Sequence, residues 1–236
     1  NTLIELMGQA NAQEFYRRWE ANIVNEADVQ QWARWGANSV RLPFNYKSLS
    51  SADGTYIEKG FEQLDQIIGW CKKNGIYVIL DMHAAPGAQN DELMSDCPDG
   101  IARLWTEASK YQPWTVHLWQ EIAARYANEP AVAGYNIFDE PILPEGYTVE
   151  KDLKGFYVEV TRAIRQVDRT HILFFDGSRW SRDFEGLDVP WDSNMVYCPH
   201  KYWDKNDQES VQKYLDLRAK TNCPIWNAET GENTEQ

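Results

Sequence analysis

Residues that build metal centres and disulfide frameworks are scarce in this 236-residue chain. Its four cysteines show no Cys-x-x-Cys spacing, and none of its four histidines is paired at metal-ligand spacing. We therefore expect neither a structural zinc site nor a disulfide framework, and we predict no metal and no cofactor. The glycine-rich patterns GxGxxG and GxxxxGK[ST] are also missing, which argues against a nucleotide-binding sheet.

Basic residues and long apolar runs are in short supply as well. The chain has 23 Lys and Arg against 36 Asp and Glu, a formal net charge of -13. Phosphate binding requires a basic surface, so we expect no nucleic-acid partner. No run of 18 apolar residues occurs, so we expect no membrane span. The first residues, NTLIELMGQA, lack the basic stretch and apolar core of a signal peptide.

Aromatic residues, by contrast, are plentiful, with 11 Trp and 12 Tyr. Such side chains commonly fill a core, but their faces also stack on the apolar C–H faces of sugar rings. The composition therefore leaves carbohydrate binding open beside a purely structural role.

Segments with helical periodicity alternate with short apolar segments. The pattern predicts helices at 26–37, 58–75, 114–130, 149–168 and 209–220, and strands at 38–44, 76–83, 131–141, 170–177, 193–202 and 223–231. Strands that are apolar throughout are typical of a parallel sheet covered by helices, either an open doubly wound sheet or a (β/α)8 barrel. No linker or repeat interrupts the pattern, so we predict one domain over residues 1–236.

Polar residues stand at the carboxyl end of every predicted strand. They are Arg41, His83, Asp139, Glu140, Asp176, His200, Tyr202 and Glu229. A single polar strand end is more often a helix cap or a satisfied hydrogen bond than a catalytic group. A succession of them at one edge favours the barrel, because barrel enzymes draw catalytic groups from the carboxyl ends of several strands.

Two carboxylates on different strands, Glu140 and Glu229, are the minimum set for cleaving a glycosidic bond. One must be protonated and the other ionised, so their environments must separate their pKa values. Arg41 and Tyr202 are candidates to hold Glu229 ionised. The structural alternative is a buried Arg–Glu ion pair at the barrel mouth. A phosphate-binding barrel is disfavoured by the acidic charge and the lack of a glycine-rich late loop.

Five motifs carry a resemblance to a known family. RLPF (41–44), DMHAAPG (81–87), DEP (139–141), HKY (200–202) and AETGE (228–232) resemble glycoside hydrolase family 5 in order and spacing, over about residues 26–232. The resemblance implies a TIM barrel and a retaining endo-β-glycosidase, most commonly one that hydrolyses β-1,4-glucan. Mannan, xyloglucan and mixed-linkage glucan stay open as substrates. A catalytically silent carbohydrate-binding barrel stays open as a different class.

The resemblance also implies the roles of individual residues. Glu140 matches the acid/base, and Glu229 matches the nucleophile of a double displacement. Arg41 and Tyr202 would orient Glu229 and stabilise its charge.

Further residues are implied to line the sugar site. His83 and His200 would do so, with His200 near the acid/base. Asn90 would reach a sugar hydroxyl, and Trp180 and Trp203 are candidate stacking platforms.

One departure from the family pattern concerns the residue before the acid/base. The family has Asn there, whose amide contacts the 2-hydroxyl of the reacting sugar, whereas this chain has Asp139. We predict that Asp139 is protonated in place of the amide or that activity is reduced. Restoring Asn at 139 should raise the turnover rate.

A second departure concerns the number of strands. Strands two to seven of the family's barrel can be identified, but not the first and last, nor the Trp that the last strand supplies. We expect a partial catalytic barrel, which is either a fragment or is closed by a second chain or a further segment. A polysaccharide substrate, too large to enter a cell, implies a secreted, periplasmic or cell-surface location.

Overall fold

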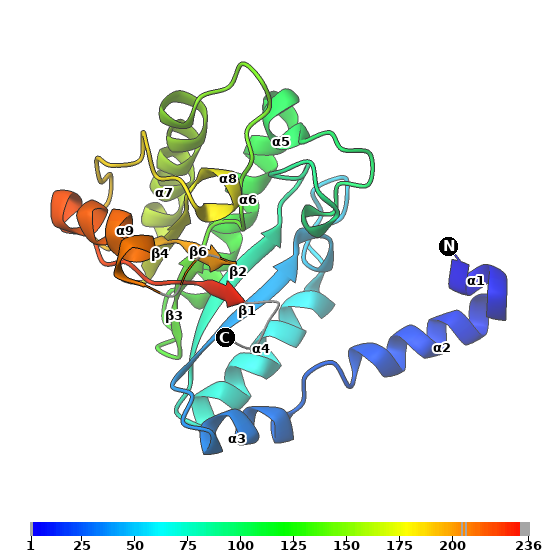
Figure 1. Ribbon diagram of the computed structural model, residues 1–236. Helices are drawn as coiled ribbons and strands as arrows, with labels where there is room; N and C mark the ends of the chain where they lie inside the picture. The colour runs from blue at the N-terminus through cyan, green and yellow to red at the C-terminus, as the bar shows by residue number, and fades with distance from the viewer. Residues whose placement is uncertain (1, 204, 206, 232–236) are drawn as a thin grey trace.

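The computed structural model describes residues 2–203, 205 and 207–231 (Figure 1). Its strands are β1 (Ser39–Asn45), β2 (Tyr77–Ala84), β3 (Val132–Asn136), β4 (Ile172–Asp176), β5 (Met195–Cys198), β6 (His200–Tyr202) and β7 (Glu229–Gly231). Its α-helices are α1 (Thr2–Met7), α2 (Gln9–Glu20), α3 (Glu26–Arg34), α4 (Glu58–Lys73), α5 (Arg103–Thr106), α6 (Ala108–Tyr126), α7 (Lys154–Val167), α8 (Ser178–Ser181) and α9 (Gln208–Thr221). None of the helices in these ranges is both long and apolar enough to cross a membrane.

The first five strands form one parallel sheet in chain order, β1-β2-β3-β4-β5. Strands β6 and β7 form a second parallel pair. An isolated parallel bridge between Tyr197, on β5, and Ile225 links the five-stranded sheet to the segment that leads into β7. Helices α4, α6 and α7 connect successive strands and place Phe61, Trp119 and Tyr157 in the core that they share with the sheet. The chain thus folds as a partial (β/α)8 barrel, which confirms the predicted fold class.

Helix ends follow signals that the sequence carries. The Asn25 side chain accepts hydrogen bonds from the N–H groups of Ala27 and Asp28, and the Asp28 carboxylate accepts one from the N–H of Asn25. This reciprocal cap begins α3. Helix α4 ends just before Gly75, whose φ of 69° suits a helix C-terminus. Helix α6 starts earlier than predicted, at Ala108, and accommodates Pro113 within it.

The fifth predicted strand, 193–202, differs from the structure because it breaks at Pro199. Proline has no N–H to donate to a ladder, so β5 pairs with β4 before the break and β6 pairs with β7 after it. The Pro199 carbonyl accepts a hydrogen bond from the N–H of Ala228, at 3.1 Å. As a result His200 lies in register with Glu229. Of the predicted strand 223–231, β7 is the part that forms a regular ladder.

The first two helices lie apart from the barrel. Figure 1 shows α1 and α2 extending away from the strands and from α4. The aromatic side chains of Phe15, Tyr16 and Trp19 on α2 are exposed. The core that positions the polar strand ends is therefore built by residues that follow these helices.

Candidate active site

One guanidinium group, on β1, joins residues of β2, β7 and the end of β3. Arg41 on β1 donates from Nε to Asn136 Oδ1 at 2.9 Å and from Nη2 to Asp139 Oδ1 at 2.6 Å. Its Nη1 donates to Glu229 Oε1, and its Nη2 lies 3.2 Å from Asp81 Oδ2. The Arg41 side chain is only 11% exposed, so these contacts are shielded from solvent. Arg41 therefore fixes the position of Glu229 relative to β3.

Glu229 has the environment of an ionised carboxylate. Burial alone would raise its pKa, but the positive charges of His200 and Arg41 lower it. Hydrogen bonds from Tyr202 and Arg41 add to this lowering, with Tyr202 Oη 2.9 Å from Glu229 Oε2. The net pKa is below the ordinary glutamate value, so Glu229 carries a negative charge at neutral pH and can act as a nucleophile.

Glu140 is held by its backbone as well as by its side chain. It follows β3 with a φ of 43°, in the left-handed region that costs a non-glycine residue roughly 1–2 kcal/mol. Its N–H donates to Asp176 Oδ2 at 3.1 Å, and its C=O accepts from Asn90 Nδ2 at 2.9 Å. Its Oε1 lies 2.7 Å from His200 Nδ1. These contacts stabilise the strained backbone that turns the carboxyl group toward β6 and β7.

His200 lies between the two glutamates. Its Nδ1 is 2.7 Å from Glu140 Oε1 and 3.6 Å from Glu229 Oε2. Although burial alone favours the neutral imidazole, the negative charges of Asp176 and Glu140 raise the pKa of His200 to about 9. The two glutamate oxygens cannot be farther apart than these two distances laid end to end. This limit concerns one oxygen of each carboxyl group, and it admits the short carboxylate spacing of retaining glycosidases.

Asp139 is fully buried beside the two glutamates. Its Oδ1 faces Arg41, whereas its Oδ2 has no hydrogen-bond partner in the described part of the chain and lies 3.5 Å from His83 Nε2. Burial and the negative charges of Asp176 and Asp81 raise the pKa of Asp139 to about 8. At neutral pH this carboxyl group is therefore mostly protonated, and it can donate a hydrogen bond as an amide does.

Two groups of side chains are close enough to share a metal ion. They are Asp81 with His83 and Asp139, and Asp139 with His200 and Glu229. Arg41 contacts a carboxylate of both groups, so its positive charge already offsets theirs and would repel a divalent cation. His83 adds to this, because its hydrogen bond to Asp81 outweighs the effect of burial and raises the pKa of His83 to about 9. These residues fit a charge network centred on arginine better than a metal centre.

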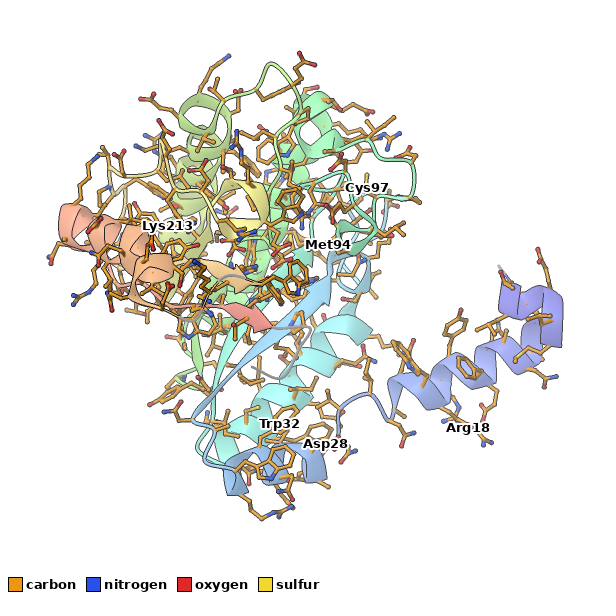
Figure 2. All side chains as sticks on the ribbon, viewed as in Figure 1. Arg18, Asp28, Trp32, Met94, Cys97 and Lys213 are labelled. Atoms are coloured by element: carbon orange, nitrogen blue, oxygen red, sulfur yellow. The ribbon has the colours of Figure 1, made fainter. Side chains whose placement is uncertain are left out.

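A cleft of about 510 Å³ opens over the two glutamates. Its lining residues are Glu92, Met94, Glu140, Trp180, Arg182, Tyr202, Trp203 and Glu229. Figure 2 labels Met94, which comes from the long loop after β2. Trp180 and Trp203 are 43% and 65% exposed, and both have a positive φ. The structure thus brings both predicted tryptophans to the cleft that holds the glutamates.

The predicted role of Asn90 is wrong in this structure. Its side chain is fully buried, with Nδ2 bonded to the Glu140 carbonyl and Oδ1 bonded to the Glu92 N–H. No part of it is available to a sugar hydroxyl. The neighbouring Gln89 acts similarly, donating from Nε2 to the carbonyls of Asp139 and His83 at 2.8 Å each. Both side chains position the backbone of the acid pair.

Sequence reasoning missed Asp81 and Asn136, which belong to the same network. Asp81 lies two residues before His83 on β2, and period-two alternation puts both on one face of the strand. Their contact, 3.0 Å from Asp81 Oδ2 to His83 Nδ1, follows from that spacing. Asn136 lies at the end of β3 and donates to Asp176 Oδ1 at 2.9 Å. Its strand reads as apolar, so the sequence gave little sign of it.

The partial barrel brings two glutamates together, and one of them is held ionised. Carboxylate-dependent glycosidases use this arrangement. A model of the cellulase family, glycosyl hydrolase family 5, matches residues 5–236, and the chain belongs to this family. The predicted family is thereby confirmed. The last residue of the AETGE motif, Glu232, lies outside the described residues.

Several curated relatives are similar in sequence. A beta-xylosidase of Phanerodontia chrysosporium is 35% identical over 85% of this chain and 42% of its own length. A probable glucan 1,3-beta-glucosidase A of Aspergillus fumigatus is 29% identical over 94% of this chain and 52% of its own. Endoglucanase C of Acetivibrio thermocellus is 28% identical over 80% of this chain and 53% of its own length. The chain spans about half the length of these curated relatives.

Solved structures show the same fold. The endoglucanase Cel5A of Pseudomonas stutzeri in complex with cellobiose aligns with a TM-score of 0.71 at 21% identity, over 88% of this chain and 65% of that one. Thermotoga maritima Cel5A in complex with mannotriose aligns with a TM-score of 0.68 at 20% identity, over 88% of this chain and 72% of that one. At this level of identity the likeness concerns the fold.

Proposed function

We propose that this chain carries the catalytic site of a retaining β-glycosidase, and that its substrate is β-1,4-glucan cleaved internally. The observation that carries the proposal is the position of His200 Nδ1, within 3.6 Å of an oxygen of each glutamate. Both carboxyl groups thus lie close to one imidazole, and the ionised Glu229 supports direct attack by a carboxylate.

The proposed reaction has two steps. In the first, Glu229 attacks the anomeric carbon while Glu140 gives a proton to the leaving oxygen, which forms a glycosyl ester on Glu229. In the second, Glu140 takes a proton from water, and the water oxygen displaces Glu229. Arg41 and Tyr202 hold Glu229 in place and ionised at the start of each cycle. Protonated Asp139 would keep a neutral carboxyl group beside the two glutamates, with Oδ2 as its unpaired oxygen within the described residues.

Covalent trapping tests this proposal. An activated 2-deoxy-2-fluoro-cellobioside forms the glycosyl ester, and the fluorine slows its breakdown, so label accumulates on the nucleophile. Intact and peptide masses should place one label on the peptide that holds Glu229. Label on another carboxylate would overturn the assignment. Absence of label with this and with the matching mannoside would favour the catalytically silent carbohydrate-binding barrel.

An exo-acting β-glycosidase is the second candidate. It is favoured by the identities to a beta-xylosidase and a glucan 1,3-beta-glucosidase, 35% and 29%, which exceed the 28% to the endoglucanase. The 2-fluoro-glucoside and 2-fluoro-xyloside separate the two modes when they are used beside the cellobioside. Faster labelling by a single-sugar probe, together with release of single sugars from cello-oligosaccharides, would establish the exo mode.

The net charge of the chain favours one class of substrate, and that substrate in turn implies a location. A chain with a net charge of -13 suits a neutral polysaccharide better than an acidic one. Mannan, xyloglucan and mixed-linkage glucan satisfy that condition as well as β-1,4-glucan does. Because a polysaccharide does not enter the cell, we propose that the enzyme works outside it.

Replacing Asp139 with Asn should raise the turnover rate, and more so as the pH rises. The raised pKa of Asp139 means that the carboxyl group is neutral below about pH 8 and negative above it. The ionised form loses its donor and adds a charge beside both glutamates, whereas the amide does neither. We expect the ratio of kcat in D139N to kcat in the parent to grow to about tenfold near pH 9.

The measurement is a kcat profile from about pH 5 to about pH 9 on an aryl cellobioside. Asp216→Asn, an exposed position on α9, serves as the matched control and should leave the profile unchanged. A ratio that stays constant across the profile, or that falls below one, would contradict a protonated Asp139.

A further inference from the structure

A second cavity, of about 200 Å³, lies among the helices that cover the sheet. Its walls come from α5, the start of α6, the start of α7 and the segment that leads into α7. Helices α6 and α7 lie side by side in Figure 1, with α5 next to the start of α6. Among the described residues, none that lines this cavity also lines the cleft above the two glutamates. The cavity is therefore a candidate site separate from the catalytic one.

A glycine in the wall keeps this cavity open. Gly155 lies near the start of α7, where glycine forms a helix less readily than alanine does. A side chain built at this position meets no heavy atom of the described residues within 4 Å. Steric crowding therefore does not explain the glycine. Its effect on the structure is an unobstructed wall of the cavity.

The turn that precedes α7 has an uncommon hydrogen-bond pattern. Residues Val149–Leu153 form a short π-helix. The Thr148 carbonyl accepts from the N–H of Asp152 at 2.9 Å and from that of Leu153 at 3.4 Å. π-helical turns are rare, and they occur frequently at functional sites. Here the turn brings Lys151 and Asp152 to the cavity.

The cavity has an aromatic floor. Trp105 and Phe156 are buried there, with their ring centroids 6.1 Å apart, and Tyr147 adds a ring that is 36% exposed. Such rings pack well on the apolar C–H face of a sugar. The volume of about 200 Å³ is below the ~300–1,000 Å³ of pockets for drug-sized ligands, so it suits a single sugar ring.

Polar side chains at the rim offer both donors and acceptors. Gln112, Lys151 and Glu159 make no side-chain hydrogen bond to any described residue. Asp152 uses Oδ2 to accept from the Thr148 N–H at 2.8 Å, which leaves Oδ1 for a ligand. Sugar hydroxyl groups both donate and accept, so they match this mixture. Two carboxylates against one ammonium group disfavour a negatively charged ligand.

The cavity is connected to the acid pair in two ways. Trp105 Nε1 donates to the Gln89 carbonyl at 2.8 Å, and Gln89 Nε2 donates to the Asp139 carbonyl at 2.8 Å. Tyr147 belongs to the loop that begins directly after Glu140. An occupant of the cavity contacts a residue of each connection, so its binding favours the arrangement that holds the acid pair.

We propose that this cavity binds one neutral sugar ring, a hexopyranose such as glucose, at a site distinct from the catalytic cleft. The apolar face of the ring packs on the aromatic floor. Its hydroxyl groups donate to Asp152 and Glu159, and they accept from Gln112 and Lys151. The choice of glucose as the probe rests on the proposed function, because glucose is the unit of the proposed substrate. The site itself goes beyond that function.

Two glycine variants test the site. Gly155→Gln places a side chain in the cavity from the wall of α7. Gly69→Gln is the matched control, because Gly69 lies inside α4 and a side chain built there also meets no heavy atom of the described residues within 4 Å. Thermal unfolding should show that both variants are at least as stable as the unaltered protein, since glutamine forms a helix more readily than glycine.

Binding is measured with 2-deoxy-2-fluoroglucose, whose fluorine resonance broadens when the sugar binds to the protein. The unaltered protein and Gly69→Gln should bind the probe alike, whereas in Gly155→Gln we expect Kd to rise by about tenfold or more. The cleft is the same in all three proteins, so binding there cancels from the comparison. Tyr147→Ala should weaken binding in the same direction. Equal binding in Gly155→Gln and the unaltered protein would overturn the proposal, as would no binding to the unaltered protein.

Competing sugars identify the class of ligand. Glucose should displace the probe more readily than glucuronate, which is negatively charged, or protonated glucosamine, which is positively charged. Stronger displacement by either charged sugar would overturn the neutral class. Displacement by methyl β-cellobioside as readily as by glucose would identify the end of a polysaccharide chain as the source of the ring, and displacement by glucose alone would identify a free sugar.

Hydrogen exchange measures the connection to the acid pair. Glucose should slow the exchange of backbone amides in residues 145–153 of the unaltered protein and of Gly69→Gln, but not of Gly155→Gln. Without glucose, all three proteins should cleave an aryl cellobioside at the same rate. Lack of cleavage by the unaltered protein would count against the proposed function alone. Unchanged exchange in the presence of glucose would count against the sugar site alone.

Discussion

Glu229→Ala should lose at least about four orders of magnitude in kcat/KM on aryl cellobiosides. The loss is expected because water in the vacated space cannot form the ester that divides the reaction into two steps. Arg41 and Tyr202, which direct their donors at Glu229, would be left facing a cavity. A small anion should fit there and bind to the same donors.

Azide supplies the test of this expectation. With 2,4-dinitrophenyl β-cellobioside as substrate, azide should attack from the side that Glu229 occupied and give the α-cellobiosyl azide, which NMR identifies by its anomeric coupling. Glu62→Ala, an exposed position on α4, is the matched control and should keep its activity without azide. A variant at 229 that retains ordinary activity, or that gives the β-azide, would contradict the role of nucleophile.

The predictable part of this site came from a geometric rule. Parallel strands end at one edge of a sheet, so residues as distant in the chain as Arg41, Glu140 and Glu229 could be expected to meet. That expectation needed only the approximate position of each strand, because Arg41 lies within β1 and Glu229 lies at the start of β7. The contacts of Arg41 with Asp139 and Glu229 are direct consequences.

The unpredicted part depends on loops and on breaks within strands. Pro199 divides one apolar segment between two neighbours, and the segment's length and hydrophobicity alone did not show on which side each half would pair. Asn90 was assigned to a sugar hydroxyl because it follows a motif that lines the cleft. The conformation of the loop after β2 instead turns it inward to the Glu140 carbonyl. Propensity describes such loops poorly, because their form is set by the tertiary contacts they make.

The electrostatic character of Asp139 was partly accessible from sequence. Its position beside Glu140 indicated a crowded negative charge, and hence either a protonated form or reduced activity. The cause in the structure is broader, because full burial and the charges of Asp176 and Asp81 both raise its pKa. Those two aspartates come from strands that the sequence treats as independent, so their combined effect required the folded arrangement.

Glu140→Ala should show a loss that depends on the leaving group. For cellotetraose or an unactivated alkyl cellobioside, whose leaving oxygen needs a proton, kcat/KM should fall by about 10³-fold. For 2,4-dinitrophenyl cellobioside, whose leaving group departs without a proton, the first step should be little affected. The glycosyl ester should then accumulate, because the base for the second step is missing.

This pattern separates Glu140 from every group that merely supports the site. A positioning residue such as Asn90 would lower the rates for both leaving groups alike, because it moves the whole of the acid pair. A burst of dinitrophenol followed by slow turnover, relieved by azide with formation of the β-cellobiosyl azide, is the expected result for Glu140→Ala. The β-azide forms because azide attacks the ester on Glu229 from the face that the leaving group left.

Glu145→Ala, an exposed position in the same loop, should show neither the burst nor the azide effect. Equal losses for the two leaving groups would remove the acid/base role from Glu140, and with it the two-step reaction proposed for this site.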